Sequence, residues 1–375
     1  MKRTIKKFLL PVVAAVAVTF GACSDWTETE SLDINYPSLD KQNPELYKQY
    51  LEALRTYKAT DHPVTIVSVP GRTAAPSQQN EHFTNLPDSV DYICVTNPAG
   101  LHPMLAAEIT EVHKKGTRVV YDIDYEAIES LWEKELEEEQ AAKPEQPGTP
   151  GEPAVVQESG DDEPTSGQEL ERRFLEFCRE QAELQLSYCA RYGFDGVTVS
   201  YEGRAPLSMT EAERAAYAAR QDAFFSTVAG WTSKHGDKLL FFRGSPQNLV
   251  DVSFLSGCRY IIVPAPGAVS ADQLSLAVLM SAASGVPTDR FIVGVTTPSI
   301  TDPADENGYF SAFEADGKSR MRATKGAARW TVAPAAGYTK AGIAVADAQN
   351  DYYNITLVYK NIREAIDIMN PAPKN

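Results

Sequence analysis

The sequence has few of the residues that build metal sites or bind nucleic acids. Its 375 residues include five histidines and five cysteines, and no two cysteines form a Cys-x-x-Cys pair. That spacing argues against a zinc site, and we expect no metal and no cofactor. Basic residues are also scarce: 35 Lys and Arg against 51 Asp and Glu give a formal charge of −16. A chain this acidic repels phosphate backbones, so we expect no nucleic-acid partner.

The apolar run near the start of the chain, residues 8–20, is too short to span a membrane. It follows a basic stretch and ends with Gly21, Ala22 and Cys23, which resembles the lipobox of bacterial lipoproteins. We predict a signal peptide over 1–22, lipidation of Cys23 and an acidic tether over 23–43. The protein would then be anchored in the outer membrane, at the cell surface. The alternative is an ordinary cleaved signal with an incidental cysteine.

Short β-branched runs alternate with helical patterns along the rest of the chain. The eight runs cover residues 64–69, 90–95, 117–122, 197–201, 238–242, 260–263, 291–295 and 341–345. Helical patterns separate many of them, for example at 103–115, 168–192, 210–234 and 271–284. Eight strands in such alternation close into a barrel more readily than they form an open sheet. We therefore predict an α/β fold, a (β/α)8 TIM barrel, over residues 44–371.

One segment interrupts this alternation after the third strand. Residues 133–167 are acidic at first and then rich in Pro, Gly and Glu. Such a composition buries too little apolar surface to offset the chain entropy that ordering costs. We predict a disordered acidic insertion beside the mouth of the barrel, either a solvated loop or a lid over the site.

The fourth strand is unusual because one of its faces is polar. Side chains alternate between the faces of a strand, so Thr198, Ser200 and Glu202 share the face opposite Val197 and Val199. A strand that carries two hydroxyls and a carboxylate on its inner face would bring polar groups to the mouth of a barrel. The plainer interpretation is a solvated strand end.

The stretch that begins at Asp195-Gly196 and ends at Glu202 resembles the strand-four signature of family 18 glycoside hydrolases, Asp-Gly-x-Asp-x-Asp-x-Glu. In that family the final Glu is the general acid, and the Asp two residues before it orients the substrate's own N-acetyl group as the nucleophile. The resemblance implies that Glu202 is a vestigial general acid. Both middle aspartates are replaced, by Thr198 and Ser200.

The resemblance extends over about 44–371 and reaches segments 85–91, 291–295 and 363–371, which look like a bacterial lipoprotein branch of family 18. A further departure lies on the sixth strand. Relatives that hydrolyse glycans usually carry a Gln-x-Tyr-like end there, whose Tyr supports the acetamido group, whereas this chain reads Ile-Val-Pro over 262–264. Three catalytic supports are therefore missing.

Other polar and aromatic residues at strand ends are candidates for glycan contacts. Carboxylates bond sugar hydroxyls and aromatic rings stack on sugar rings. The expected substrate-binding residues are Asp195, Thr198, Ser200, Tyr201, Asp122, Asp124, Asp347 and Tyr352. Asp122, Asp124 and Glu126 alternate along the third strand, so one of them could pair with Glu202. The alternative is that they balance basic groups around the mouth.

The sequence as a whole predicts a lipid-anchored, family 18-like protein that binds N-acetylglucosamine-containing glycans with little or no hydrolysis. One alternative is an active endo-β-N-acetylglucosaminidase or chitinase-like hydrolase that uses Glu202 as its acid. Another is a non-catalytic scaffold subunit of an outer-membrane glycan-uptake complex. The expected partners are the glycan, the membrane through the lipid anchor, and outer-membrane uptake proteins.

Overall fold

The computed structural model describes residues 39–142, 166–302 and 304–371. The chain divides into two units, residues 1–49 and 50–375, and the second unit holds the barrel. No helix among the described residues is both long enough and apolar enough to cross a bilayer. Cys23 and the predicted signal peptide lie outside the described residues, as does the tether up to residue 38.

Eight parallel strands close into a barrel in the order β1-β10-β7-β6-β5-β4-β3-β2. These strands are β1 (Val64–Pro70), β2 (Tyr92–Thr96), β3 (Arg118–Asp124), β4 (Gly196–Tyr201), β5 (Leu239–Gly244), β6 (Tyr260–Pro264), β7 (Phe291–Thr296) and β10 (Lys340–Ala346). Each of the eight runs expected from the sequence is one of these strands. The TIM barrel prediction is therefore confirmed.

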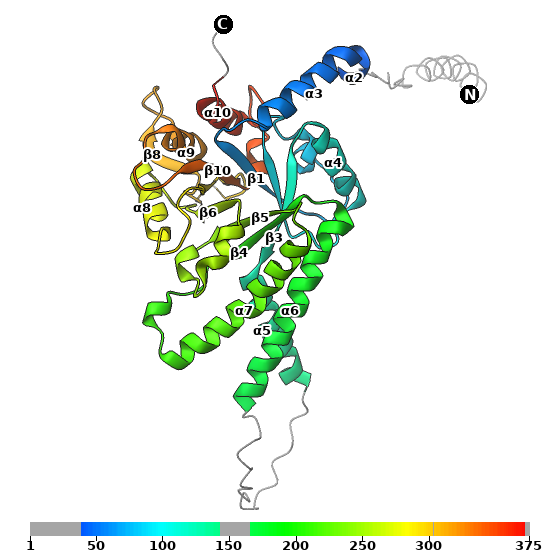
Figure 1. Ribbon diagram of the computed structural model, residues 1–375. Coiled ribbons are helices and arrows are strands. Elements are labelled where there is room, and N and C mark those ends of the chain that lie inside the picture. Colours follow the sequence, from blue (N-terminus) through cyan, green and yellow to red (C-terminus); the bar gives the residue numbers. More distant parts are fainter. Residues whose placement is uncertain (1–38, 143–165, 303, 372–375) are drawn as a thin grey trace, which may run out of the picture. The chain divides into compact units, whose positions relative to one another are not determined.

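Helices of the second unit surround the barrel (Figure 1). They are α4 (Pro103–Lys114), α5 (Tyr125–Ala142), α6 (Ser166–Tyr192), α7 (Glu211–Lys234), α8 (Ala271–Ser281), α9 (Ala323–Val332) and α10 (Lys360–Met369). Before β1 the chain forms α2 (Leu39–Gln42) and α3 (Pro44–Lys58). Short 3-10 turns lie in the loops, including η1 (Gln79–Glu81), η2 (Phe83–Asn85), η4 (Pro246–Asn248) and η6 (Ala348–Asp351). An α-helix lies between most consecutive barrel strands, but only 3-10 turns separate β1 from β2 and β5 from β6. Because the strands are parallel, their carboxyl ends meet at one rim.

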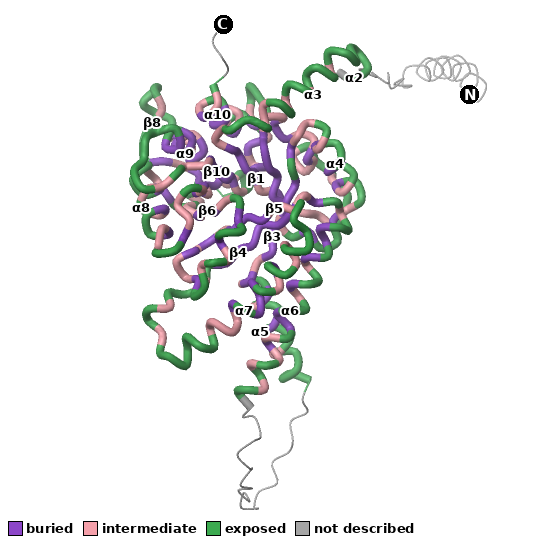
Figure 2. The backbone as a smooth tube through the Cα atoms, viewed as in Figure 1, coloured by how far each residue is buried: buried purple, intermediate pink, exposed green. Residues whose placement is uncertain are grey.

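The barrel has two buried layers, and the strands form the buried centre in Figure 2. Inside the barrel, side chains such as Ile66, Cys94, Val120, Phe241 and Ile292 pack together. The alternate residues of the same strands face the helices and belong to the larger outer core. Because side chains alternate along a strand, this division assigns every strand residue to one face.

Two parts of the chain differ from the sequence prediction. Helix α5 continues to Ala142 and α6 begins at Ser166, so both ends of the predicted 133–167 insertion are helical. The reason lies in packing: Trp132 and Phe174 make an edge contact across α5 and α6, with ring centroids 6.0 Å apart. The sequence prediction also missed a two-stranded antiparallel hairpin, β8 (Tyr309–Phe313) with β9 (Arg320–Arg322), between β7 and α9.

Candidate functional site at the barrel mouth

A cavity of about 350 Å³ opens at the carboxyl ends of the strands, where TIM barrels carry their sites. Its lining combines four charged side chains with small and aliphatic ones. It is lined by Ser68, Asp124, Glu126, Ser200, Tyr201, Glu202, Arg243, Ile262, Pro264, Pro266, Gly294, Val295, Ala344 and Ala346. Its volume lies in the range of small-molecule sites.

Strand β4 directs its polar face into the barrel, as its alternation predicts. Thr198 is fully buried, with its hydroxyl 3.6 Å from the Cys94 thiol, so it lies beneath the cavity floor. Ser200 is 5% exposed and lines the cavity, while Glu202 is exposed at the rim. Ser200 and Glu202 can therefore touch a ligand, whereas Thr198 can only support the floor.

The floor of the cavity is an ion pair that the sequence analysis did not identify. Arg243, on β5, donates from Nε to Ser200 Oγ at 2.8 Å and from Nη2 to Asp122 Oδ2 at 2.5 Å. Ser200 in turn donates to Asp122 Oδ1 at 2.5 Å. Burial raises the pKa of Asp122, and the Arg243 charge opposes that rise. Asp122 is thus committed to Arg243 and Ser200 and is not free to bind substrate.

The sequence did contain a signal that Arg243 faces the inside of the barrel. Arg243 lies two residues beyond Phe241, which belongs to the inner barrel core, so strand alternation places both on the inner face. Arg243 is also the direct β-ladder partner of Ser200. Arg243 therefore lies on the inner face near the end of its strand, beside Ser200, which replaces a motif aspartate. This combination indicates that the site differs from the family pattern.

Glu202 is held in place by its neighbours at the rim. Ser245 donates to the Glu202 carboxylate at 2.7 Å, and Asn248 donates to its backbone carbonyl at 2.7 Å. Glu126 accepts from the backbone N–H groups of Glu202 and Gly203 at 2.7 and 3.0 Å. Gly203 has a left-handed φ of 53°, and a Cβ there would meet the Tyr217 hydroxyl at 2.3 Å. The turn after Glu202 therefore requires glycine.

The carboxylates of Asp124, at the end of β3, and Glu126, on α5, accept hydrogen bonds from backbone N–H groups. Asp124 accepts from the Ala127 N–H at 3.1 Å at the start of α5, and Glu126 anchors the loop after β4. Both line the cavity, where their remaining oxygens can accept from sugar hydroxyls. Burial raises the pKa of Glu126, although the two backbone N–H groups oppose the rise. A second cavity of about 420 Å³ shares Glu126, Tyr201 and Glu202 with the first and extends toward α7.

Asp195, an expected substrate-binding residue, does not line the cavity. It precedes β4, at the amino end of the barrel, and accepts from His113 Nε2 and the Val119 N–H, both at 2.7 Å. Burial opposes ionisation, but the hydrogen bonds from His113 and Val119 lower the pKa of Asp195 below its ordinary value. Asp195 ties β4 to β3 and α4, which is a structural role.

The structure packs the rings of both aromatic candidates against other aromatic residues. Tyr201 is 1% exposed, and its ring packs on the helix side of the barrel 5.3 Å from Phe225. Its hydroxyl accepts from Gln221 Nε2 at 2.7 Å, so the ring cannot stack on a sugar in the cavity. Tyr352 is half-buried, and its ring lies edge-on to Tyr359 at 5.3 Å. It is not part of the cavity lining.

Asp347 lies just after β10 and outside the lining of the cavity. Its backbone is left-handed, with φ of 53°, and its carboxylate accepts from Thr296 Oγ1 at 3.2 Å. Its backbone carbonyl accepts from Thr297 Oγ1 at 2.6 Å. These bonds join the ends of β7 and β10, so Asp347 shapes the rim rather than the floor.

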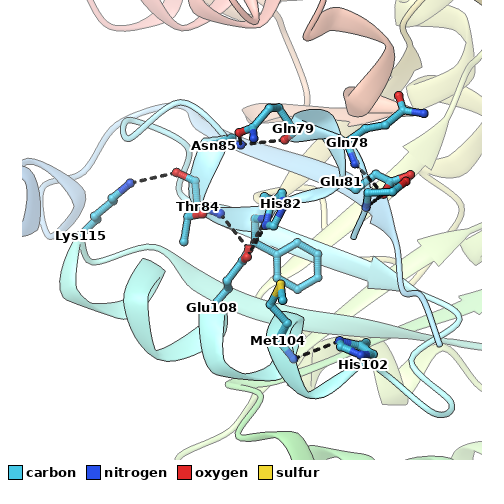
Figure 3. Close-up of polar contacts among 12 residues, drawn as sticks. Gln78, Gln79, Glu81, His82, Thr84, Asn85, His102, Met104, Glu108 and Lys115 are labelled. Carbon is cyan, nitrogen blue, oxygen red and sulfur yellow. Dashed lines mark hydrogen bonds and ion pairs between the residues drawn. The ribbon is translucent and has the colours of Figure 1, made fainter. Parts of the chain in front are cut away.

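The loop between β1 and β2 is fixed at the rim by a buried glutamate that the sequence analysis missed. Glu108, on α4, accepts from the Phe83 and Thr84 N–H groups at 2.7 and 3.3 Å and contacts His82 Nδ1 at 2.5 Å (Figure 3). In the same loop, Asn80 donates to the carbonyl of Gln349, which follows the neighbouring strand β10, at 3.4 Å. The loops after β1 and β10 therefore meet at the rim.

The arrangement can donate and accept hydrogen bonds at a concave, partly apolar site, but β4 carries Ser200 and no carboxylate two residues before Glu202. In the described ranges, no three His, Cys, Asp or Glu side chains are grouped as a metal site would require. The four buried cysteines at 94, 178, 189 and 258 are free thiols. The charged groups available to a ligand are Arg243 and the rim carboxylates.

Comparison with known proteins agrees with the fold described above. The family described as glycoside hydrolase family 18, BT1044-like, matches residues 27–368. A solved structure of a BT1044 variant is similar over 89% of this chain and 96% of its own, at 16% identity and a TM-score of 0.60. A GH18 chitinase from Pseudoalteromonas aurantia is similar over 80% of this chain and 99% of its own, at 13% identity and a TM-score of 0.46.

A plant class V chitinase mutant from Cycas revoluta, solved in complex with (GlcNAc)3, is similar over 81% of this chain and 99% of its own. Its identity is 12% and its TM-score 0.46. No curated protein sequence matches the chain. Because the family match covers nearly all of the barrel, the chain belongs to glycoside hydrolase family 18, in its BT1044-like group.

Proposed function

We propose that the chain binds N-acetylglucosamine-containing glycans at the barrel mouth and hydrolyses them slowly or not at all. The observation that carries this proposal is the Arg243 guanidinium, which is bonded to Ser200 and Asp122 on the cavity floor. Ser200 stands where the family motif has its second middle aspartate. A cationic group therefore lies where a carboxylate would assist the reaction.

The electrostatics of this floor oppose substrate-assisted hydrolysis. In that reaction the acetamido oxygen attacks the anomeric carbon and a cationic oxazolinium forms, which a neighbouring carboxylate stabilises. Here Ser200 supplies no charge, Asp122 is neutralised by Arg243, and Ile262 and Pro264 form the wall on β6. Removing one well-placed electrostatic stabiliser typically costs roughly 10²–10³ in rate. Because several catalytic groups are missing together, we expect the protein to bind glycans with little or no hydrolysis.

The same groups remain suited to holding a neutral sugar. Arg243 Nη1 has no hydrogen-bond partner in the part of the chain that the structure describes, and the side chain lines the cavity. It can donate to a sugar or acetamido oxygen. Asp124, Glu126 and Glu202 can accept from hydroxyls at the rim. A guanidinium locked in place from two sides loses little entropy when it binds.

A calorimetric titration with chitobiose tests the binding half of this proposal, with cellobiose, which carries hydroxyls in place of the acetamido groups, as the comparison ligand. We expect saturable binding of chitobiose and weaker binding of cellobiose. Glu202→Gln should change the chitobiose affinity by less than about threefold, because the rim hydrogen bonds survive the exchange. Absence of chitobiose binding at millimolar concentrations would refute the proposal and leave the scaffold alternative.

The cellular part of the proposal is that Cys23 carries a lipid that anchors the protein in the outer membrane, facing the cell surface and glycan-uptake proteins. The lipobox-like Gly-Ala-Cys at 21–23 supports it. Acyl chains anchor firmly because each buried methylene contributes about 0.8 kcal/mol. Cys23→Ser should move the protein from the membrane fraction to the soluble fraction. Equal partitioning of variant and wild type would exclude lipidation at this thiol.

A further inference from the structure

A third, larger cavity lies between the β8–β9 hairpin and the start of α10. Its volume is about 750 Å³, and we call it the hairpin groove. Tyr309 and Arg320 line it from the hairpin, and Lys360 and Arg363 line it from α10. It shares no lining residue with the mouth cavity, so it is a separate site.

Most cations in the hairpin groove have no carboxylate partner in the described ranges. Arg320 and Arg322 stack on the ring of Tyr309, with their guanidinium carbons 4.9 and 4.6 Å from its centroid. Arg320, Arg322 and Lys360 have no carboxylate partner within the described ranges. Stacking fixes the two guanidinium planes on one ring while leaving their N–H groups available.

The carboxylates of the groove are mostly committed elsewhere. Glu314 and Glu364 both bind Lys325, at 2.8 and 2.5 Å. Asp316 accepts from the backbone N–H groups of the turn that follows it, at 2.8 Å each. Asp367 is the one carboxylate of the lining without such a bond in the described structure. Five cations against four carboxylates leave the lining with one net positive charge, on a chain whose formal charge is −16.

The neutral lining is hydrophilic. Asn354 and Asn361 donate their amide N–H groups to Asp351, at 3.0 and 2.5 Å, which leaves their amide oxygens as acceptors. Leu357 is the aliphatic side chain among the groove residues that the structure describes. Acceptors for hydroxyls beside forked donors for an anion suit a ligand that is both polyhydroxylated and negatively charged.

We propose that the hairpin groove binds an acidic sugar residue, one that carries a carboxylate or a sulfate ester. The paired guanidiniums on Tyr309 hold the anionic oxygens, Lys360 adds charge, and the asparagine oxygens accept from the hydroxyls. The groove would thus recognise an acidic unit of a glycan, independently of any sugar bound at the barrel mouth. This proposal does not depend on the function proposed for the mouth.

Calorimetric titrations with a glucuronic acid disaccharide, N-acetylglucosamine 6-sulfate and inorganic sulfate test the proposal and distinguish the two anionic groups. We expect at least one acidic sugar to bind, with an affinity that falls as salt rises, because exposed charges are screened over about 8 Å at physiological ionic strength. Arg320→Gln with Arg322→Gln should weaken that binding at least about tenfold. Arg320→Lys with Arg322→Lys should lose less, because the charges remain.

The matched control is Arg172→Gln with Arg173→Gln on α6, where both arginines have carboxylate partners. It removes the same charge and should leave acidic-sugar binding unchanged. Thermal melts of each variant establish that the fold persists, and chitobiose titrations report the mouth separately. The proposal is overturned if neither acidic sugar binds at millimolar concentrations, or if the groove variant binds as well as the control. Inorganic sulfate binding as tightly as both sugars would overturn the assignment to a sugar.

Discussion

The two ends of strand β4 carry residues of one sequence motif, but the residues at the two ends have different roles. At the amino end, Asp195 keeps the motif residue and joins β4 to His113 and the Val119 backbone. At the carboxyl end, Ser200 departs from the motif and meets Arg243 in the cavity. The retained residue supports the fold, and the replaced one lies where chemistry would occur. A partial motif can therefore preserve a barrel while the groups at its mouth change.

The largest expected effect comes from the cavity floor. Arg243→Met leaves the Asp122 carboxylate buried without its charge partner, which should lower the free energy of unfolding by about 3–5 kcal/mol. Asp122→Asn combined with Arg243→Met should recover most of this loss, since no charge is then buried alone. Urea unfolding of both variants measures the difference, with Arg204→Met at the exposed rim as the control. Equal destabilisation in the single and double variants would show that Arg243 acts through packing alone.

A smaller effect is expected at the amino end. Asp195→Asn weakens the hydrogen bonds from His113 and Val119 and should cost about 1–3 kcal/mol at pH 7. Because the pKa of Asp195 in the folded protein lies below the ordinary value of 3.8, its stabilising effect is complete above that value. It is lost as the pH falls through the folded-state pKa.

Unfolding measured from pH 7 down to pH 3 checks this dependence. Wild type and Asp195→Asn should differ most near neutrality and converge in acid. Chitobiose affinity at pH 7 should be equal in the two proteins, because Asp195 lies at the other end of the barrel. A constant stability difference across the range would mean that the carboxylate charge does not matter there.

The smallest effect is expected on the helix side of β4. Tyr201→Phe removes the hydroxyl that accepts from Gln221, so it should cost about 0.5–1.5 kcal/mol. Its chitobiose affinity should match the wild type, because the ring packs against Phe225 and not in the cavity. Thermal melting and calorimetry on the same sample separate the two outcomes. A marked loss of affinity with unchanged stability would place Tyr201 at the sugar after all.

The sequence predicted the eight strands because each is a short β-branched run, and strand alternation correctly placed Thr198 and Ser200 on the inner face. Glu202 lies beyond the end of β4, exposed at the rim of the cavity. Contacts between strands were harder to foresee, because they depend on the stagger of the closed barrel. Ser200 lies beside Asp124 and Arg243 in the β-ladders yet donates to Asp122. That cross-strand geometry is not encoded in any local pattern.

Aromatic and acidic residues at strand ends were likewise ambiguous from sequence. Tyr201 and Glu202 are neighbours, yet one faces the helices and the other the mouth, so proximity to the motif did not indicate a role. Asp195 illustrates the same problem, because a motif residue before a strand lies a full strand length from the rim. Only the direction of the parallel strands assigns it to the amino end.

The most direct test of the binder account is a product assay by mass spectrometry on a chitobiose-core glycan during prolonged incubation. Wild type should release little or no cleaved product. Thr198→Asp with Ser200→Asp should also remain inactive, because Arg243 would neutralise the new carboxylate at position 200. Readily measured cleavage by the wild type that disappears in Glu202→Gln would contradict the account and establish an active hydrolase with Glu202 as its acid.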